Sequence, residues 1–170
     1  LSASELKGFL KDQPWQGLNV TIPYKKDACA LADSASEDAQ AIGAANTLIK
    51  DTNGFIAADN TDVYGFEYLV KSLKVNLSQK IAMVFGAFGG AGQAICYALN
   101  KGGAYVVGVS RNPHESSSYV DCAITYDQIK SHYDADLLVN ATPVGMFPHA
   151  GDSPLSKEEL AAFTSLQCVI

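Results

Sequence analysis

The sequence lacks any concentrated positive charge. Its 12 lysines and arginines are outnumbered by 18 aspartates and glutamates, which leaves a net charge of -6, and its densest basic cluster is Tyr24-Lys25-Lys26. A protein that binds the phosphate backbone of a nucleic acid needs a positive face. We therefore expect no nucleic-acid partner.

Long hydrophobic runs are also missing. The longest, such as 81–85 and 137–139, have the length of strands, whereas a helix that crosses a bilayer needs ~18 or more apolar residues. No charged segment followed by an apolar stretch and a cleavage site opens the sequence, so no secretory signal is visible. We expect no membrane association.

Cysteine and histidine are few and scattered. The four cysteines, at 29, 96, 122 and 168, have no C-x-x-C spacing, which indicates neither a disulfide framework nor a metal site. We predict that Cys29, Cys96 and Cys168 are small buried hydrophobes and that the protein is cytoplasmic. Because the chain starts at Leu1 without a Met and stops inside an apparent strand, 168–170, we expect it to be part of a longer protein.

The composition that remains is that of a folded chain. Hydrophobic residues make up 48% and charged residues 18% of the 170 residues, which suits one full domain or two small ones. In the first part we expect a helix opened by a capping box of Ser2 and Glu5. The elements expected after it are a strand over 18–22 ended by Pro23, a helix from Pro23 toward Leu31, a helix over 34–42, and a β-hairpin of 45–50 and 55–59.

The second part alternates strands and helices. After a helix over 62–73 and a break at 76–78, the apolar pattern predicts strands at 80–85, 104–109, 122–124 and 137–140, with a helix to Lys101 and a short helix near Gln128. Such alternation favours a parallel sheet covered by helices on both faces. The fold class is thus α/β, with a first α/β portion at 1–62, a connecting helix and linker at 63–77, and a Rossmann-type doubly wound parallel sheet at 78–170.

A glycine-rich loop follows the strand at 80–85 and opens a helix. The spacing is G-x-x-G-x-x-G, and the residues predicted to meet a dinucleotide there are Gly86, Ala87, Gly89, Gly90 and Ala91. Glycines let backbone N–H groups approach a pyrophosphate, whose charge the helix N-terminus favours. The alternative is a tight turn with no ligand.

The next strand ends in Ser110-Arg111-Asn112, where an NAD enzyme usually carries an acidic residue. An arginine offers paired donors to phosphate, so we expect these three residues to bind the 2'-phosphate of NADP. The alternative is an ordinary solvated arginine.

Six segments occur together in the order seen in shikimate dehydrogenases. They are 19–25 (NVTIPYK), 43–47 (GAANT), 59–62 (DNTD), the glycine loop, 110–112 (SRN) and 140–146 (NATPVGM). The chain resembles that family over nearly its whole length. The resemblance implies that Lys25 and Asp62 are the catalytic pair, that Thr21 and Asn46 bind substrate, and that Asn140, Ala141, Thr142 and Met146 lie beside the nicotinamide. We also expect Asn19 to bind substrate, because it lies with Thr21 and Lys25 near the C-terminal end of a predicted strand.

The chemistry of these residues agrees with the resemblance. Reduction of a ring ketone needs a proton donor at the carbonyl oxygen, which a lysine ammonium held by a carboxylate can be. Taken singly, Lys25 would be a surface lysine, Asp62 a helix N-cap and Asn46 a turn residue. The resemblance implies NADP-dependent interconversion of 3-dehydroshikimate and shikimate, in aromatic amino acid biosynthesis, by a monomer or homodimer.

Two alternatives stay open at this stage. One is a quinate/shikimate dehydrogenase that uses NAD or NADP, and the other is a dinucleotide-binding fragment without turnover. The glycine loop departs from the family pattern through an extra Phe88 and through Gly92 and Gln93, where a small and a basic residue are usual. Relative to the family, the segment with the serines that bind the substrate carboxylate and the segment with a tyrosine and a glutamine near the ring are absent. We therefore expect this span alone to be inactive toward shikimate.

Overall fold

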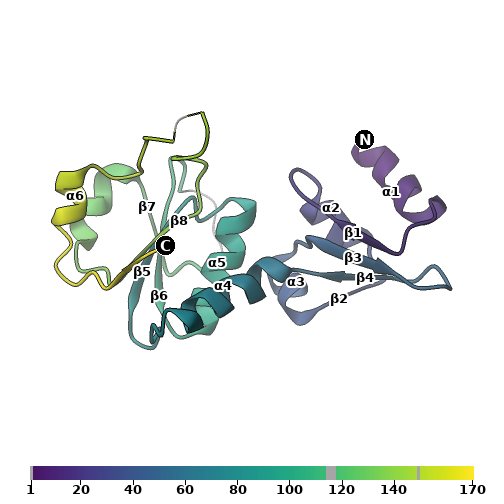
Figure 1. Ribbon diagram of the computed structural model, residues 1–170, viewed down its shortest axis with the longest axis horizontal. Helices are drawn as coiled ribbons and strands as arrows, with labels where there is room; N and C mark the ends of the chain where they lie inside the picture. Colours follow the sequence, from purple (N-terminus) through teal and green to yellow (C-terminus); the bar gives the residue numbers. More distant parts are fainter. Residues whose placement is uncertain (1, 114–117, 149) are drawn as a thin grey trace. The chain divides into compact units, whose positions relative to one another are not determined.

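The computed structural model describes residues 2–113, 118–148 and 150–170 (Figure 1). The chain divides into two compact units, with the boundary between Gly65 and Phe66. Each unit has its own sheet, of four and of five strands. The α/β fold class predicted from the sequence is confirmed.

The first unit contains a mixed sheet and three helices, which come before the helix that crosses the boundary between the units. The strands run in the order β1-β3-β4-β2; β1 and β4 are antiparallel to β3, and β2 is parallel to β4. The hairpin turns at Asp51, whose carboxylate accepts hydrogen bonds from the backbone N–H groups of Asn53 and Phe55. The elements are α1 (Ala3–Asp12), β1 (Gly17–Asn19), α2 (Lys25–Leu31), β2 (Ser34–Ala35), α3 (Glu37–Ile42), β3 (Thr47–Lys50) and β4 (Ile56–Asp59).

The capping box at Ser2 and the hairpin are confirmed, whereas several predicted bounds are wrong, among them the start of the helix predicted from Pro23, which begins at Lys25. The helix predicted over 34–42 begins only at Glu37, because Ser34 and Ala35 pair with β4 and the Ser36 hydroxyl accepts a hydrogen bond from Ala39 N–H as the N-cap. The strand predicted over 18–22 ends at Asn19. The chain then turns, with Tyr24 N–H bonded to the carbonyl of Thr21, and α2 starts after Pro23.

One face of this sheet carries the core of the first unit. Leu6 and Leu10 of α1 and Ala28 of α2 pack on Leu48 and Ile56. Lys50 holds α1 in place, because its Nζ donates to the carbonyls of Leu10, Lys11 and Gln13 at the C-terminal end of that helix and lies 5.2 Å from the ring centre of Trp15.

The second unit is a five-stranded parallel sheet, in the order β7-β6-β5-β8-β9, as the alternation predicts. Helix α4 (Thr61–Ser72) leads into it from the first unit. The capping box of Ser156 and Glu159 opens a short helix that we did not predict. The remaining elements are β5 (Ile81–Phe85), α5 (Gly90–Lys101), β6 (Tyr105–Val109), β7 (Cys122–Ile124), the 3-10 helix η1 (Tyr126–His132), β8 (Leu137–Asn140), α6 (Lys157–Ala161) and β9 (Cys168–Val169).

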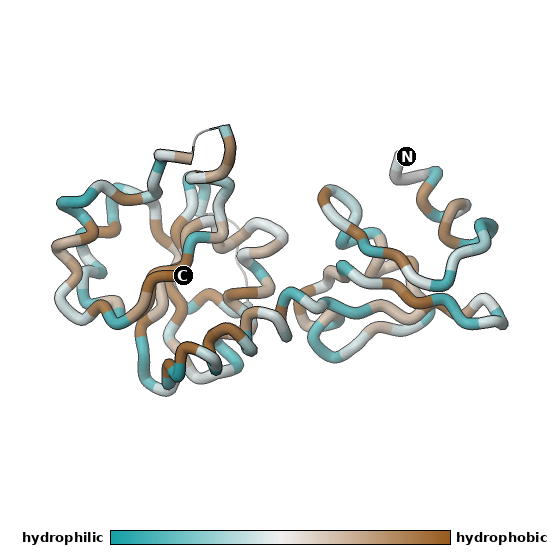
Figure 2. The backbone as a smooth tube through the Cα atoms, viewed as in Figure 1, coloured by the Kyte–Doolittle hydropathy of each residue, from teal (hydrophilic) through white to brown (hydrophobic). Residues whose placement is uncertain are grey.

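Alternate residues of the central strands face opposite sides of this sheet. Met83, Phe85 and Leu138 pack with Ile129 of η1 and Phe163 on one side, while α5 contacts β5 and β6 and covers the other side (Figure 1). The hydrophobic residues accordingly gather in the strands of the sheet, and hydrophilic ones in the loops (Figure 2).

Asp136, just before β8, connects the amino ends of neighbouring strands through hydrogen bonds. Its carboxylate accepts hydrogen bonds from Lys80 Nζ, Ile81 N–H and Gln167 Nε2. Burial raises the pKa of Asp136, but the bonds from Ile81 and Lys80 outweigh it, so the pKa lies below its ordinary value of 3.8. One carboxylate thus joins the amino ends of β5, β8 and β9.

The cysteines differ in burial. Cys96 is buried, and burial raises the pKa of its thiol to about 12. Cys29 and Cys168 are only partly buried, so the prediction of full burial is wrong for both; Cys168 lies on β9, at the edge of the sheet. Among the described residues, no group of His, Cys, Asp and Glu is arranged to hold a metal ion, and no helix is long and apolar enough to cross a membrane.

Candidate active site

Lys25 and Asp62, far apart in the sequence, meet in the first unit. Lys25 is the first residue of α2, and Asp62 lies in the first turn of α4. Lys25 Nζ is 2.7 Å from Asp62 Oδ2, and the exposed fractions of the two side chains are 16% and 35%. The ion pair is therefore formed without being sealed from solvent, so its ammonium is accessible to a ligand.

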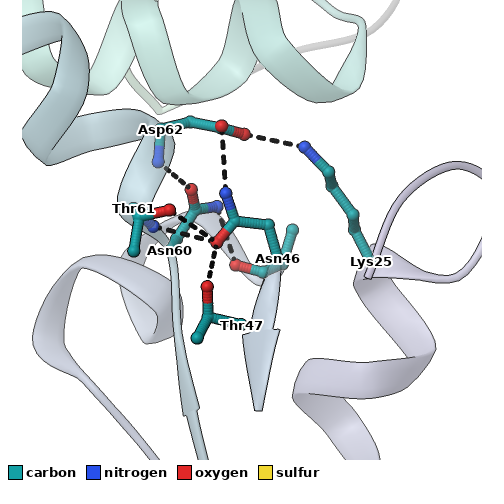
Figure 3. A network of polar contacts seen from close by, with 7 residues as sticks. Lys25, Asn46, Thr47, Asn60, Thr61 and Asp62 are labelled. Carbon is teal, nitrogen blue, oxygen red and sulfur yellow. Dashed lines mark hydrogen bonds and ion pairs between the residues drawn. The ribbon is translucent and has the colours of Figure 1, made fainter. Parts of the chain in front are cut away.

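Asn46 forms a hydrogen bond with the other oxygen of the Asp62 carboxylate. Its Nδ2 donates to Asp62 Oδ1 over 3.0 Å (Figure 3). Both carboxylate oxygens thus have a donor, which fixes the plane of the Asp62 carboxylate. An ammonium held in this way can donate a proton to a carbonyl oxygen and remain oriented.

Asn60 positions the first turn of α4. It is 2% exposed, and its Nδ2 donates to the carbonyl of Ala44 while its Oδ1 accepts from Asp62 N–H. This is the geometry of an asparagine N-cap. Sequence reasoning missed Asn60 as part of the site, although an asparagine just before an amphipathic helix is the signal that could have found it.

Asn19 and Thr21 lie nearby in the chain but outside this network. Asn19 is the last residue of β1, with backbone register to Thr47, and Thr21 is in the turn that leads into α2. Both residues are exposed. Within the described part of the chain, neither side chain is hydrogen-bonded to Lys25 or Asp62, so both remain available to a ligand.

The glycine loop of the second unit requires glycine at two positions. Gly86 has φ +76°, and a Cβ there would lie 2.9 Å from Thr142 Cγ2. A Cβ on Gly92 would lie 2.1 Å from the carbonyl oxygen of Gly86, so α5 packs directly on the loop that precedes it. The third glycine therefore serves close packing of the helix on the loop.

The loop borders an open cavity of about 690 Å³ at the carboxyl ends of the parallel strands. Six of the predicted cofactor residues line it: Gly86, Gly89, Ser110, Arg111, Ala141 and Thr142. Six lining residues were missed, namely Val109, Tyr126, Pro143, Val144, Ser153 and Pro154. Thr125-x-x-Gln128, a capping box, signals the start of η1 and hence places Tyr126; the sequence carries no comparable signal for Ser153 and Pro154.

The other predicted cofactor residues do not line this cavity. Ala87 is fully buried. Gly90 and Ala91 are the first two residues of α5, and Asn112 follows β6. Met146, 65% exposed, borders a separate hollow with Phe147 and Asp152.

The side chain of Asn140 makes its hydrogen bonds to residues of the loop that follows β8. Its Oδ1 accepts hydrogen bonds from the backbone N–H and the hydroxyl of Thr142, and its Nδ2 donates to the carbonyl of Val144. The side chain therefore shapes the loop that follows β8 and holds Thr142 at the cavity wall.

Comparison with known proteins relates this chain to one family. Residues 2–48 match a model described as the shikimate dehydrogenase substrate binding domain. A relative from Clostridium beijerinckii named shikimate dehydrogenase (NADP(+)) is 37% identical over 158 residues, which cover 91% of this chain. The chain spans only 58% of that relative's length.

Solved structures share the whole fold. A chorismate mutase/shikimate 5-dehydrogenase fusion protein from Clostridium acetobutylicum superposes with a TM-score of 0.82 at 31% identity, covering 98% of this chain and 69% of that one. Quinate dehydrogenase from Corynebacterium glutamicum, in complex with NAD, also has a TM-score of 0.82, at 28% identity, covering 99% of this chain and 62% of that one. The chain belongs to the shikimate dehydrogenase family.

Proposed function

We propose that the protein containing this chain is an NADP-dependent oxidoreductase that interconverts 3-dehydroshikimate and shikimate. The observation that carries the proposal is the Lys25–Asp62 ion pair, 2.7 Å long and backed by Asn46, in a chain whose relative is named for this activity. An oriented, solvent-accessible ammonium is the acid that reduction of a ring ketone requires.

Each residue of the first unit has a role in this proposal. As the ring carbon accepts hydride, Lys25 gives a proton from Nζ to the carbonyl oxygen, and the neutral amine regains a proton from solvent. Asp62 keeps Nζ in place. Thr21, Asn46 and Asn19 supply hydroxyl and amide groups for the ring hydroxyls, which suits a polyhydroxylated substrate.

The second unit fits a dinucleotide. The cavity of about 690 Å³ lies where ligands bind in open α/β sheets, beyond the carboxyl ends of the strands, and the positive φ of Gly86 and the crowding at Gly92 match a phosphate loop. NADP, when bound, supplies or accepts the hydride. Of the predicted residues that line the cavity, Gly86 and Gly89 would face the pyrophosphate of NADP, Ser110 and Arg111 its 2'-phosphate, and Ala141 and Thr142 its nicotinamide end.

We assign the segments accordingly: 1–62 to substrate binding and catalysis, 63–77 to a connection, and 78–170 to NADP binding. The main test is turnover of the full-length protein with shikimate or quinate and NADP or NAD, followed by absorbance of the reduced nicotinamide. We expect the highest kcat/KM for shikimate with NADP. Absence of turnover with all four pairs would overturn the proposal.

A second candidate is a quinate dehydrogenase that uses NAD, because the quinate dehydrogenase from Corynebacterium glutamicum superposes on 99% of this chain. The same four assays decide between them. A higher kcat/KM for quinate with NAD than for shikimate with NADP would favour this candidate.

Calorimetric titration of NADP and shikimate into the 170-residue span addresses the third alternative, a binding module without turnover. We expect NADP to bind, because the residues assigned to it are local to the second unit, and we expect no turnover by the span alone. Turnover of shikimate by the isolated span would contradict that expectation.

A further inference from the structure

We propose that Thr47 and Thr61 are positioning residues that fix the orientation of the Asn46 side-chain amide. The proposal rests on the proposed function, because it concerns the group that touches both Asp62 and, by assignment, the substrate. No feature of the sequence motifs alone assigns this role to either threonine.

Three donors converge on one oxygen atom. Asn46 Oδ1 accepts hydrogen bonds from Thr47 Oγ1 at 3.0 Å, Thr61 N–H at 3.0 Å and Thr61 Oγ1 at 3.2 Å (Figure 3). We call these three bonds the carbonyl clamp. A carbonyl oxygen has two lone pairs, so the clamp saturates it and leaves it no capacity to accept from a ligand.

The carbonyl clamp fixes the orientation of the amide nitrogen, Nδ2. With Oδ1 occupied, Nδ2 points to Asp62 Oδ1, and a rotated amide would bring its oxygen against the carboxylate and its NH₂ against the Thr61 N–H. Asn46 therefore presents only donors outside the clamp. One N–H is used by Asp62, and the second remains for an acceptor oxygen such as a substrate hydroxyl.

The two threonines reach the clamp from different elements. Thr47 is the first residue of β3, where its backbone has register to Asn19 and Asp59, and Thr61 is the first residue of α4. The clamp thus ties the start of β3 to the start of α4, both within the first unit. Hydrogen bonds in such a chain polarise one another, so each hydroxyl strengthens the donor that faces Asp62.

Isosteric variants of the full-length protein test the clamp. Thr47→Val and Thr61→Val remove one hydroxyl each and keep the shape, while Thr47→Ser and Thr61→Ser keep the hydroxyl. Thr52→Val, in the exposed hairpin turn, controls for the general effect of the substitution. The readouts are kcat and KM for shikimate with NADP, and the side-chain amide signals of Asn46 in protein labelled with ¹⁵N at asparagine.

For each Val variant we expect KM to rise by about two- to tenfold, the loss of one net hydrogen bond, with a smaller fall in kcat because the Lys25–Asp62 contact remains. The Asn46 signals should shift in the Val variants and return in the Ser variants. Wild-type KM and signals in both Val variants would overturn the proposal, as would equal losses in the Val and Ser variants or a KM change without a signal shift.

The amide signals also separate this proposal from the proposed function. If the wild-type protein turns over neither shikimate nor quinate, the proposed function fails, whereas a signal shift in Thr47→Val that Thr47→Ser restores still supports the clamp.

Discussion

The two units prepare their sites in opposite ways. In the first unit the functional side chains are bonded to one another before any ligand is present, as Lys25, Asp62 and Asn46 show. In the second unit the site is an open cavity whose lining includes Gly86 and Gly89. Its shape depends on positions where a Cβ has no room, such as Gly86 and Gly92.

Under the proposed function, this difference follows from what each site has to do. A proton donor must be held within hydrogen-bond distance of the reacting atom, which a charged network achieves. A pyrophosphate needs many N–H donors and close approach, which glycine backbone provides. The first unit is therefore sensitive to the loss of a functional group, and the second to the gain of volume.

The largest effect is expected for Lys25→Ala in the full-length protein. Loss of positioned proton transfer lowers rates by ~10² to 10⁴, so kcat for shikimate should fall by that order while substrate binding is comparatively retained. Steady-state kinetics measure this, with Lys26→Ala, at an exposed neighbour, as the control. Near-normal kcat in Lys25→Ala would show that a different group is the acid.

The second-largest effect is expected when one carbon atom is added to the second unit. Gly92→Ala places a Cβ 2.1 Å from the Gly86 carbonyl oxygen, and overpacking against backbone costs about 3 kcal/mol or more. We expect a lower melting temperature and loss of NADP binding. Gly65→Ala, in α4 with open space around the new Cβ, is the control and should not destabilise the chain. Unchanged NADP affinity in Gly92→Ala would contradict the packing argument.

Cofactor binding by the second unit is expected to depend on the side chain of Arg111, the only arginine in the sequence. Loss of a charge-assisted bond costs ~1.5 to 3 kcal/mol, which corresponds to roughly one to two decades in affinity. Arg111→Ala should weaken NADP by that factor and leave NAD unchanged, as titration calorimetry would show. Equal losses for both cofactors would mean that Arg111 supports the loop without contacting the 2'-phosphate.

A stability difference within the first unit is expected from Lys50→Met. The variant keeps the apolar stem but loses three bonds to the end of α1 and the contact with Trp15. Because part of this lysine is solvated, we expect a loss of about 1 to 2 kcal/mol in the free energy of unfolding. Denaturation in urea measures it, and Lys11→Met, exposed on α1, is the matched control. Equal stability of the two variants would refute the role of Lys50.

The smallest effect concerns pH and the second unit. Because the pKa of Asp136 is lowered in the folded state, its contribution is present above the unfolded value of 3.8 and disappears as the pH falls through the folded value. Asp136→Asn should therefore cost about 1 kcal/mol at neutral pH and flatten the acid side of the stability curve. Asp134→Asn, at an exposed position, should leave the curve unchanged; a parallel curve for Asp136→Asn would contradict the assignment.

The sequence predicted the parallel sheet and most of the candidate site, because each left a strong local signal. Apolar runs of strand length alternated with helical periods, and Lys25, Asn46 and Asp62 lay in ordered motifs. The two-residue strand β2 left no periodic signal, since its position depends on pairing with β4.

The partners of the site residues could not be predicted for a similar reason. Thr47 and Thr61 are ordinary polar residues in sequence, and only the packing of β3 beside α4 brings both hydroxyls to Asn46. Ser153 and Pro154 reach the cavity through a loop whose path no spacing rule describes. Local chemistry was visible in the sequence, whereas convergence of distant residues was not.

The attachment of three strands to Asp136 has a consequence for how such a chain can diverge. The carboxylate aligns the sheet at the amino ends of its strands, while the glycine loop, Ser110–Asn112 and Asn140–Val144 follow the carboxyl ends. Strand alignment and the proposed ligand recognition are thereby encoded at opposite edges of the sheet. Loops at the edge formed by the carboxyl ends can lengthen without disturbing the residue that sets the strands in register, and a new ligand preference can arise on the same frame.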